Sequence, residues 1–408
     1  MRILIAPDSF KESLSAKEVI NTISNAFILE MPDLTIIKVP MADGGEGTAE
    51  TLIEATNGYF VEKDVFDPLC RKIKSKYGIT GDGKRCIIEM ASCCGLSLLK
   101  PEERNPSITT TFGLGELIRD ALNKGIKEFI IGIGGSATND AGAGMLQALG
   151  FGLKDKDGKE IGFGGYELER VESIDLTNVD YNLKDTKFLI ACDVDNPMVG
   201  ENGASYVYGP QKGADMQMVE KLDKALVKFS KVIKKVTGMD IYNIPGTGAA
   251  GGIGAAFLSF LNAKLMPGFE IVSEFHNLEE KIKESDLVIT GEGKTDHQTK
   301  FGKVVSGVSK IAKRHNKPVI CISGSYTEDA TTLYDYGITA IFSSIHTPDN
   351  LENIMKNANK NLHFTALNVA RMIKFLNKKK GGGPPESLLT TLKDFEQSYQ
   401  TLIKDQAP

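Results

Sequence analysis

Short apolar runs alternate with helical patterns along much of the chain. Residues 2–6 and 34–40 are rich in β-forming apolar residues, and between them Val19, Ile23 and Phe27 recur at helical spacing. A strand, a helix and a second strand within about 40 residues are typical of a parallel βαβ unit. Further apolar runs that end in glycine or small residues span 128–135, 285–293, 317–325 and 337–345. Together these runs predict an α/β protein with about six parallel strands buried on both faces.

Two stretches interrupt this alternation. Residues 57–104 contain alternating apolar positions around Gly81-Asp82-Gly83, which predicts an antiparallel hairpin, and residues 151–279 are rich in turn-forming residues. We therefore expect a Rossmann-like, three-layer domain with a second α/β domain inserted into it and a cleft between the two. The Rossmann-like domain is expected to comprise 1–56, 105–150 and 280–376, and the inserted domain 57–104 and 151–279.

The end of the chain has a different pattern. A Gly-Gly-Gly-Pro-Pro break lies at 381–385, and Leu388, Leu392 and Phe395 begin a series of apolar residues with alternating spacings of four and three. Residues 377–408 are therefore expected to form a linker and an amphipathic helical tail. Three explanations of this tail stay open: packing on the body of the protein, association between chains, or an artificial addition.

Composition and charge argue against several functional classes. The formal net charge is −5 without a long basic run in the expected fold, which disfavours binding of nucleic acid. No apolar segment approaches the ~20 residues of a membrane-spanning helix, and the apolar run at the N-terminus is too short for an export signal. The six cysteines form no CxxC pair, so we expect free thiols in a reducing compartment. These features predict a cytoplasmic protein without a membrane partner, either a monomer or a homodimer.

The segment "APDSFKESLSA" follows the first expected strand, where ligands of open α/β sheets bind. Lys11 is a candidate for holding an anion, and Asp8 and Ser9 are candidates for ordering the loop and contacting the ligand. The alternative is purely structural, because Ser15 and Glu18 match a capping box at a helix start.

The segment "MADGGEGTAETL" follows the second expected strand. Gly44 and Gly45 allow the backbone to approach a ligand, and N–H groups at a helix start attract anions. Asp43 stands directly before them and is a further candidate for ligand binding. The alternative is a tight turn from strand to helix, with Glu46 favourably placed in the first turn.

The segment "GIGGSATNDAGAGM" contains a G-x-G-x-x-A pattern after an apolar run, which raises the possibility of dinucleotide binding. Gly134, Gly135, Ser136 and Asn139 are candidates for binding a nucleotide or substrate, the first three through backbone hydrogen-bond donors. Asn139 and Asp140 follow where the helix should begin, and a carboxylate there opposes a bare pyrophosphate. A phosphate chain that carries Mg²⁺ would tolerate or use Asp140.

Two later segments add carboxylates and a lysine. Asp193 and Asp195, in "ACDVDNP", would share one face of a strand, as carboxylates of metal or acid–base sites often do. Lys212, in the glycine-flanked "YGPQKGA", is a candidate phosphate clamp. The alternative for this region is a solvated turn with a structural aspartate.

The segment "ITGEGKTDHQT" follows another expected strand and brings Gly291, Glu292 and Asp296 into one loop. A lone histidine in a polar loop more often orients or faces solvent than acts as a base, so we do not assign catalysis to His297. The six segments together supply carboxylates for Mg²⁺, lysines for phosphates and backbone donors, which is the equipment of phosphoryl transfer.

Seven segments of the chain, in order, resemble the signature blocks of the class I bacterial glycerate kinases: "IAPDSFKESLSA", "ADGGEGT", "NPSITTTFGLGELI", "GIGGSATNDAGAGM", "ACDVDNP", "GPQKGA" and "ITGEGKTDHQT". The resemblance runs to about residue 376. It implies phosphorylation of D-glycerate to 2-phosphoglycerate or 3-phosphoglycerate, with ATP and Mg²⁺. Members of that family commonly carry Gly where this chain has Glu12, and Arg where it has Lys294.

This resemblance and the motif chemistry lead to specific role hypotheses. Lys11 or Lys212 would hold the carboxylate of glycerate or the transferred phosphoryl group. Asp193 is the first choice for the base and Asp296 the second. The candidate Mg²⁺ ligands, directly or through water, are Asp195, Glu292 and Asp140.

Two alternative functions remain open from the sequence. The G-x-G-x-x-A pattern would also suit an NAD(P)-dependent hydroxy-acid oxidoreductase, although no acidic residue ends a suitably placed second strand after it. A non-catalytic, two-lobed ligand-binding protein is the other alternative.

Overall fold

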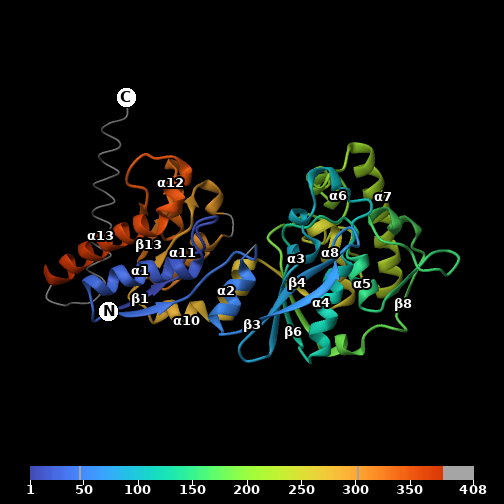
Figure 1. Ribbon diagram of the computed structural model, residues 1–408, viewed down its shortest axis with the longest axis horizontal. Helices are drawn as coiled ribbons and strands as arrows, with labels where there is room; N and C mark the ends of the chain where they lie inside the picture. The colour runs from blue at the N-terminus through green and yellow to red at the C-terminus, as the bar shows by residue number, and fades with distance from the viewer. Residues whose placement is uncertain (46, 301–302, 380–408) are drawn as a thin grey trace. The chain divides into compact units, whose positions relative to one another are not determined.

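The parts of the chain that the computed structural model describes are residues 1–45, 47–300 and 303–379. The chain forms two compact units (Figure 1). The first comprises Met1–Asp43 and the described residues from Val272 to Lys379, and the second comprises Gly44–Ile271. The second unit is therefore one continuous insertion between the two segments that make up the first.

The first unit contains a five-stranded sheet in the order β15-β13-β11-β1-β2, in which every neighbouring pair is parallel. Its register places Ile3 beside Leu287 on one side and Ile36 on the other. The residues of β11 and β13 are all buried, as expected for strands covered on both faces. The strands are β1 (Arg2–Ile5), β2 (Thr35–Lys38), β11 (Leu287–Thr290), β13 (Val319–Ser323) and β15 (Ala340–Ser343).

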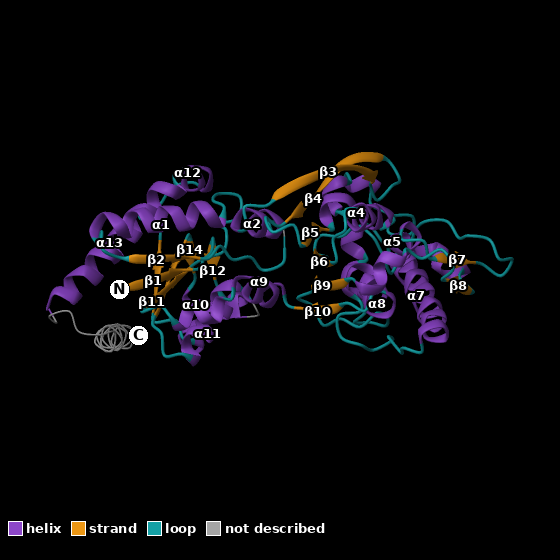
Figure 2. Ribbon diagram, turned by 90° about the horizontal axis from the view of Figure 1, so that it is seen from below, coloured by secondary structure: helices purple, strands orange, loops and turns teal. Residues whose placement is uncertain are grey.

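Helices cover both faces of this sheet (Figure 2). α1 (Ala16–Glu30) and α13 (Ala358–Lys379) pack together on one face and share an apolar core with the strands. α10 (Leu278–Lys283) and α11 (Val304–Arg314) lie on the opposite face. The three-layer α/β arrangement expected from the sequence is confirmed. Smaller elements of this unit are α12 (Leu351–Lys356) and the paired β12 (Lys294–Thr295) and β14 (Ser325–Tyr326). The helix α9 (Gly268–His276) begins in the second unit and ends in the first.

The start of α1 shows how the local sequence defines an element. The Ser15 hydroxyl accepts a hydrogen bond from the Glu18 N–H at 3.3 Å, and the Glu18 carboxylate accepts one from the Ser15 N–H at 2.8 Å. This is the capping box that the sequence predicts, and it satisfies backbone donors that the first helical turn leaves unpaired.

The second unit contains a six-stranded sheet in the order β10-β9-β6-β5-β4-β3. The pairs from β5 to β10 are parallel, whereas β3, β4 and β5 pair antiparallel. The hairpin expected around Gly81-Asp82-Gly83 is confirmed, because that segment joins β4 to β5. The strands are β3 (Tyr59–Phe66), β4 (Lys72–Ile79), β5 (Arg85–Glu89), β6 (Glu128–Gly132), β9 (Lys187–Ala191) and β10 (Lys264–Met266), and a separate antiparallel pair is formed by β7 (Gly152–Lys154) and β8 (Ser173–Asp175).

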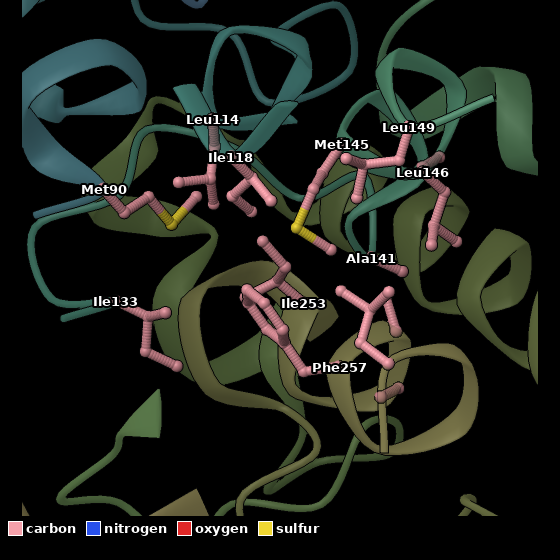
Figure 3. Packing of buried hydrophobic residues seen from close by; sticks show 14 of the residues in the cluster. Met90, Leu114, Ile118, Ile133, Ala141, Met145, Leu146, Leu149, Ile253 and Phe257 are labelled. Atoms are coloured by element: carbon pink, nitrogen blue, oxygen red, sulfur yellow. The ribbon is translucent and has the colours of Figure 1, made fainter. Parts of the chain in front are cut away.

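The second unit has its own apolar core. Side chains from α4, α5 and α8 gather in one cluster (Figure 3), among them Leu114, Ile118, Met145, Ile253 and Phe257. The helices of this unit are α2 (Thr48–Ala55), α3 (Ala91–Cys94), α4 (Phe112–Asn123), α5 (Ala143–Ala148), α6 (Ala204–Tyr208), α7 (Met216–Thr237) and α8 (Ala249–Phe260).

The expected domain boundaries are wrong in one main respect. Residues 105–150 belong to the second unit, because β6 pairs with β5 and β9 rather than with a strand of the first sheet. The first sheet consequently has five of the six expected parallel strands. An apolar strand buried on both faces is suited to either parallel sheet, so its pattern predicts the strand but not its neighbours. Residues 44–56 also lie in the second unit, and 272–279 lie in the first.

The predicted helix within the tail lies outside the described residues. No helix among the described residues is both long and apolar enough to cross a membrane.

Candidate functional site

A cavity of about 420 Å³ lies at the carboxyl end of the sheet in the first unit. This is the edge where ligands of open parallel sheets bind, and the volume is in the range of small-molecule sites. The loops after β1, β2 and β11 bring several predicted site residues into its lining: Asp8, Ser9, Lys11, Asp43, Glu292 and Asp296. Gly291 supports the same loops, since its carbonyl accepts a hydrogen bond from the Asp8 N–H at 2.8 Å.

Asp8 is the most perturbed carboxyl of the cavity. It is buried, and its Oδ1 accepts a hydrogen bond from the Ser9 N–H at 2.7 Å. Burial raises the pKa of Asp8 to about 7, and the neighbouring charge of Asp43 adds to this increase. Lys11 opposes the increase, and its Nζ lies 3.8 Å from Asp43 Oδ2. A cation placed beside Asp8 would therefore relieve an unfavourable concentration of negative charge.

Glu292 is oriented by hydroxyl groups. Its Oε1 accepts hydrogen bonds from Thr299 Oγ1 at 2.6 Å and from Thr295 Oγ1 at 3.1 Å. The Thr295 hydroxyl also lies 2.6 Å from Ser323 Oγ, at the end of β13. Burial raises the pKa of Glu292 above its ordinary value. These three hydroxyl residues were not among the predicted site residues, although Thr295 and Thr299 lie in the segment "ITGEGKTDHQT".

The other charged side chains of the cavity lie between β11 and α11. Lys294 Nζ lies 3.5 Å from Asp296 Oδ2, and Lys303 contributes to the lining just before α11 begins. His297 is exposed and its Nδ1 lies 3.1 Å from Asp329 Oδ2. The interpretation of His297 as a surface residue rather than a base agrees with this exposure.

The predicted residues of the second unit follow its parallel strands. Gly134, Gly135 and Ser136 come after β6, and a Cβ built on Gly134 would meet no atom within 4 Å, so the backbone borders open space there. Asp193 and Asp195 come after β9, which ends at Ala191. The expectation that these two aspartates share a strand face is therefore wrong. Both are exposed in the loop, where Asp193 Oδ1 accepts a hydrogen bond from the Gly268 N–H at 2.9 Å.

Lys212 does not face solvent as a phosphate clamp would. Its side chain is fully buried, and Nζ donates hydrogen bonds to Ser136 Oγ at 2.9 Å and to the Thr138 carbonyl at 2.6 Å. Burial lowers the pKa of Lys212 to about 7. The lysine therefore holds the loop after β6 in place.

Asp140 and Asn139 are likewise engaged inside the fold. The Asp140 carboxylate is buried and accepts hydrogen bonds from the Thr111 N–H and hydroxyl and from the N–H groups of Gly142 and Gly144, at 2.8 to 3.2 Å. The buried Asn139 donates to Ser205 Oγ at 3.0 Å. These bonds argue against the expected roles of Asp140 as a Mg²⁺ ligand and Asn139 as a nucleotide contact.

Gly44 is required by packing within the second unit. Its φ is +88°, and an added Cβ would lie 2.8 Å from Gly268 Cα and 2.9 Å from Ala191 Cβ. The carbonyl of the adjacent Gly45 accepts hydrogen bonds from Thr48. The structural alternative of a tight strand-to-helix turn therefore accounts for Gly44.

The family of the chain follows from comparison with known proteins. The sequence profile of the glycerate kinase family matches residues 3–374. The chain belongs to the glycerate kinase family. The match spans both units and ends before the tail, and neither the oxidoreductase nor the non-catalytic alternative is supported.

Relatives of known name agree with this membership. The chain is 48% identical to a glycerate kinase of Haemophilus influenzae over 375 residues, 92% of this chain and 99% of the relative. It is 50% identical to a glycerate 2-kinase of Escherichia coli K12 over 370 residues, 91% of this chain and 97% of the relative. A crystal structure described as a glycerate kinase 2 from Salmonella typhimurium LT2 matches with a TM-score of 0.85 and 49% identity, covering 92% of this chain and 98% of that one.

Proposed function

We propose that this member of the glycerate kinase family transfers the terminal phosphoryl group of ATP to a hydroxyl group of D-glycerate, with Mg²⁺ as the metal ion and 2-phosphoglycerate as the product. The Escherichia coli relative, which is 50% identical, is named a glycerate 2-kinase, and this name supports transfer to the 2-hydroxyl group. The single observation that carries the proposal is the cavity at the end of the parallel sheet, which combines carboxylates and lysines in one lining.

The carboxylates of the cavity suit Mg²⁺ bound to phosphate. Among the described residues, no three His, Cys, Asp or Glu side chains are grouped as a complete metal cage. Mg²⁺ does not need one, because it keeps several waters and binds through one or two carboxylates together with phosphate oxygens. Asp8 and Glu292 are the proposed ligands, since burial has raised the pKa of both and a cation would offset the cost. Bound there, Mg²⁺ would neutralise the charge that develops on the transferred group.

The lysines of the cavity suit the anionic groups of the reactants. Lys11 and Lys303 line it beside the carboxylates, and both can hold phosphate or the carboxylate of glycerate as mobile point charges. The backbone of Gly134, Gly135 and Ser136 is proposed to donate hydrogen bonds to a reactant. The exposure of the two glycines and the open space beside Gly134 support this role.

The hydroxyl of glycerate needs a group that accepts its proton or orients it for attack. Asp193 remains our first proposal for this base, because it is exposed at the end of a parallel strand and its carboxylate is oriented by the Gly268 N–H. Asp296 is the second, because it lines the cavity. Asp195, exposed in the same loop as Asp193, remains a proposed ligand through water.

Phosphorus NMR tests the reaction directly. The full chain is incubated with ATP, Mg²⁺ and D-glycerate, and the products are followed in time. We expect ADP and 2-phosphoglycerate in equal amounts, and little ADP without glycerate. Accumulation of 3-phosphoglycerate would correct the position of transfer, and absence of any phosphoglycerate would refute the proposed activity.

A further inference from the structure

The cavity of the first unit has a second, chemically different end. The carboxylates and lysines come from the loops after β2, β1 and β11, whereas the loop after β15 and the following helices contribute mainly apolar residues. In the strand order β15-β13-β11-β1-β2, β15 and β2 are the two edge strands. The apolar end therefore lies at the opposite side of the sheet from the carboxylates. Its lining residues are Ile345, Leu351, Ile354, Met355 and Ala358.

Glycines line the cavity between its two ends. Gly293 follows β11 and Gly324 follows β13, the strand between β11 and β15. The two glycines are in close contact, since a Cβ built on Gly324 would lie 2.3 Å from the Gly293 carbonyl oxygen. An elongated ligand can therefore pass from the charged end to the apolar end over bare backbone.

Two polar side chains belong to the apolar end: Ser344, whose hydroxyl donates to the Gly324 carbonyl at 3.4 Å, and Asn361. Asn361 lines the cavity, three residues after Ala358 and therefore on the same face of α13. Its side-chain amide makes no hydrogen bond with residues of the described ranges, whereas its backbone carbonyl lies 3.1 Å from His346 Nε2. An asparagine amide offers a donor and an acceptor side by side, as does the edge of a purine base.

We infer that the apolar end holds the purine base of the nucleotide, with Asn361 paired to the edge of the base and Ile354 and Met355 against its ring. This inference rests on the proposed function, because it takes the phosphates of the same nucleotide to lie at the end with Asp8 and Lys11. Aliphatic and thioether side chains pack well on a flat aromatic ring, and methionine adapts its shape to one. A long ligand with an anionic end and a flat apolar end matches both ends of the cavity.

The experiment compares a ligand that has a base with one that lacks it. Isothermal titration calorimetry measures binding of ADP and of inorganic tripolyphosphate to the full chain with Mg²⁺. For Asn361→Ala we expect the Kd of ADP to rise about fivefold, the usual effect of one lost hydrogen bond, and the Kd of tripolyphosphate to stay unchanged. For Ile354→Asp, which places a charge against the ring, we expect at least about a tenfold rise for ADP alone.

Asn357→Ala is the matched control, because Asn357 is exposed between α12 and α13 and its side chain bonds to the Asn353 carbonyl. It should bind both ligands like the parent. The inference is overturned if Asn361→Ala and Ile354→Asp both bind ADP like the parent. It is also overturned if the variants are folded by circular dichroism but lose as much affinity for tripolyphosphate as for ADP.

The same variants separate this inference from the proposed function. If the parent binds ADP at this end but produces no phosphoglycerate, the function fails and the base subsite stands. If the parent phosphorylates glycerate and both variants keep the parental KM for ATP, the function stands and the base lies elsewhere.

Discussion

Lys212 Nζ donates a hydrogen bond to Ser136 Oγ at 2.9 Å, and its second bond goes to the Thr138 carbonyl at 2.6 Å. A neutral amine has two N–H groups, which match these two acceptors. The lowered pKa of Lys212, about 7, agrees with a lysine that is often neutral in the folded protein. A buried side chain on the loop before α7 thereby supports the loop that follows β6.

Lys212→Met tests this support. The variant leaves two buried acceptors without their donor, so we expect a loss of about 1–3 kcal/mol in the free energy of unfolding at pH 9. The folded pKa of about 7 lies below the unfolded value near 10.4, so the unfolded chain binds more protons between these values and the stability of the parent rises with pH in that window. The loss should therefore be smaller at pH 6. Urea unfolding at both pH values measures it.

Lys224→Met is the control for this experiment, since Lys224 is an exposed lysine of α7. Its free energy of unfolding should stay within about 0.5 kcal/mol of the parent. A difference between parent and Lys212→Met that does not change with pH would contradict a depressed pKa for this lysine.

Asp8→Asn should make the ligand-free protein more stable and the enzyme less active. The folded pKa of about 7 lies above the unfolded value near 3.9, so the folded protein binds more protons between these values and its stability falls as pH rises through that window. Removing the buried charge should stabilise the ligand-free protein by about 1–2 kcal/mol at pH 8, with a smaller gain at pH 5, while glycerate phosphorylation falls. Thermal unfolding and a coupled assay for ADP measure the two effects.

Asp33→Asn provides the comparison for Asp8, because Asp33 is exposed and outside the cavity. It should change neither stability nor turnover. An Asp8→Asn protein that is less stable than the parent at pH 8 would contradict an unfavourable buried charge at this position, because the asparagine oxygen can still accept the hydrogen bond from the Ser9 N–H.

Glu12 occupies a conformation that suits glycine. Its φ is +64°, in the left-handed region where a Cβ is unfavourable. We expect Glu12→Gly to raise the free energy of unfolding by about 0.5–1 kcal/mol. Glu12→Ala, which keeps the Cβ, should bring no such gain. Equal effects of the two substitutions would assign the change to the lost charge instead.

The proposed base is tested by Asp193→Asn and Asp296→Asn. Loss of a catalytic base typically lowers kcat by 10²–10⁴, so we expect a decrease of about that size for Asp193→Asn and a smaller one for Asp296→Asn. Asp195→Asn, in the same loop, should affect the Mg²⁺ requirement more than kcat. Asp193→Asn activity within about tenfold of the parent, a barrier change near 1.4 kcal/mol, would transfer the role to Asp296.

The sequence predicts local structure more reliably than it predicts which strands pair with one another. The Ser15–Glu18 capping box and the hairpin between β4 and β5 are encoded by residues close together in the chain, and both are confirmed. The partner strands of β6 depend on packing over long distances, which the apolar pattern of 128–132 does not specify.

The same distinction applies to the candidate site. Motifs at strand ends predicted ligand-binding loops, and the loops after β1, β2 and β11 bring Asp8, Asp43 and Glu292 into the lining of one cavity. Burial was not predictable, because nothing near Lys212 in the sequence shows that its charged group is enclosed by the β6 loop. Asp140 illustrates the same limit, since its partner Thr111 is 29 residues away.

The insertion of the second unit has a consequence for synthesis on the ribosome. Ile3 pairs with Leu287, so the first strand emerges long before the strand that it must join. At the usual rates of translation, about 5–20 residues per second, the intervening chain takes roughly ten seconds to a minute to appear. The inserted unit, which is continuous, can fold during this delay while β1 and β2 stay without their central neighbour. Nascent chains stopped before β11 should therefore contain a folded middle and an unfolded beginning.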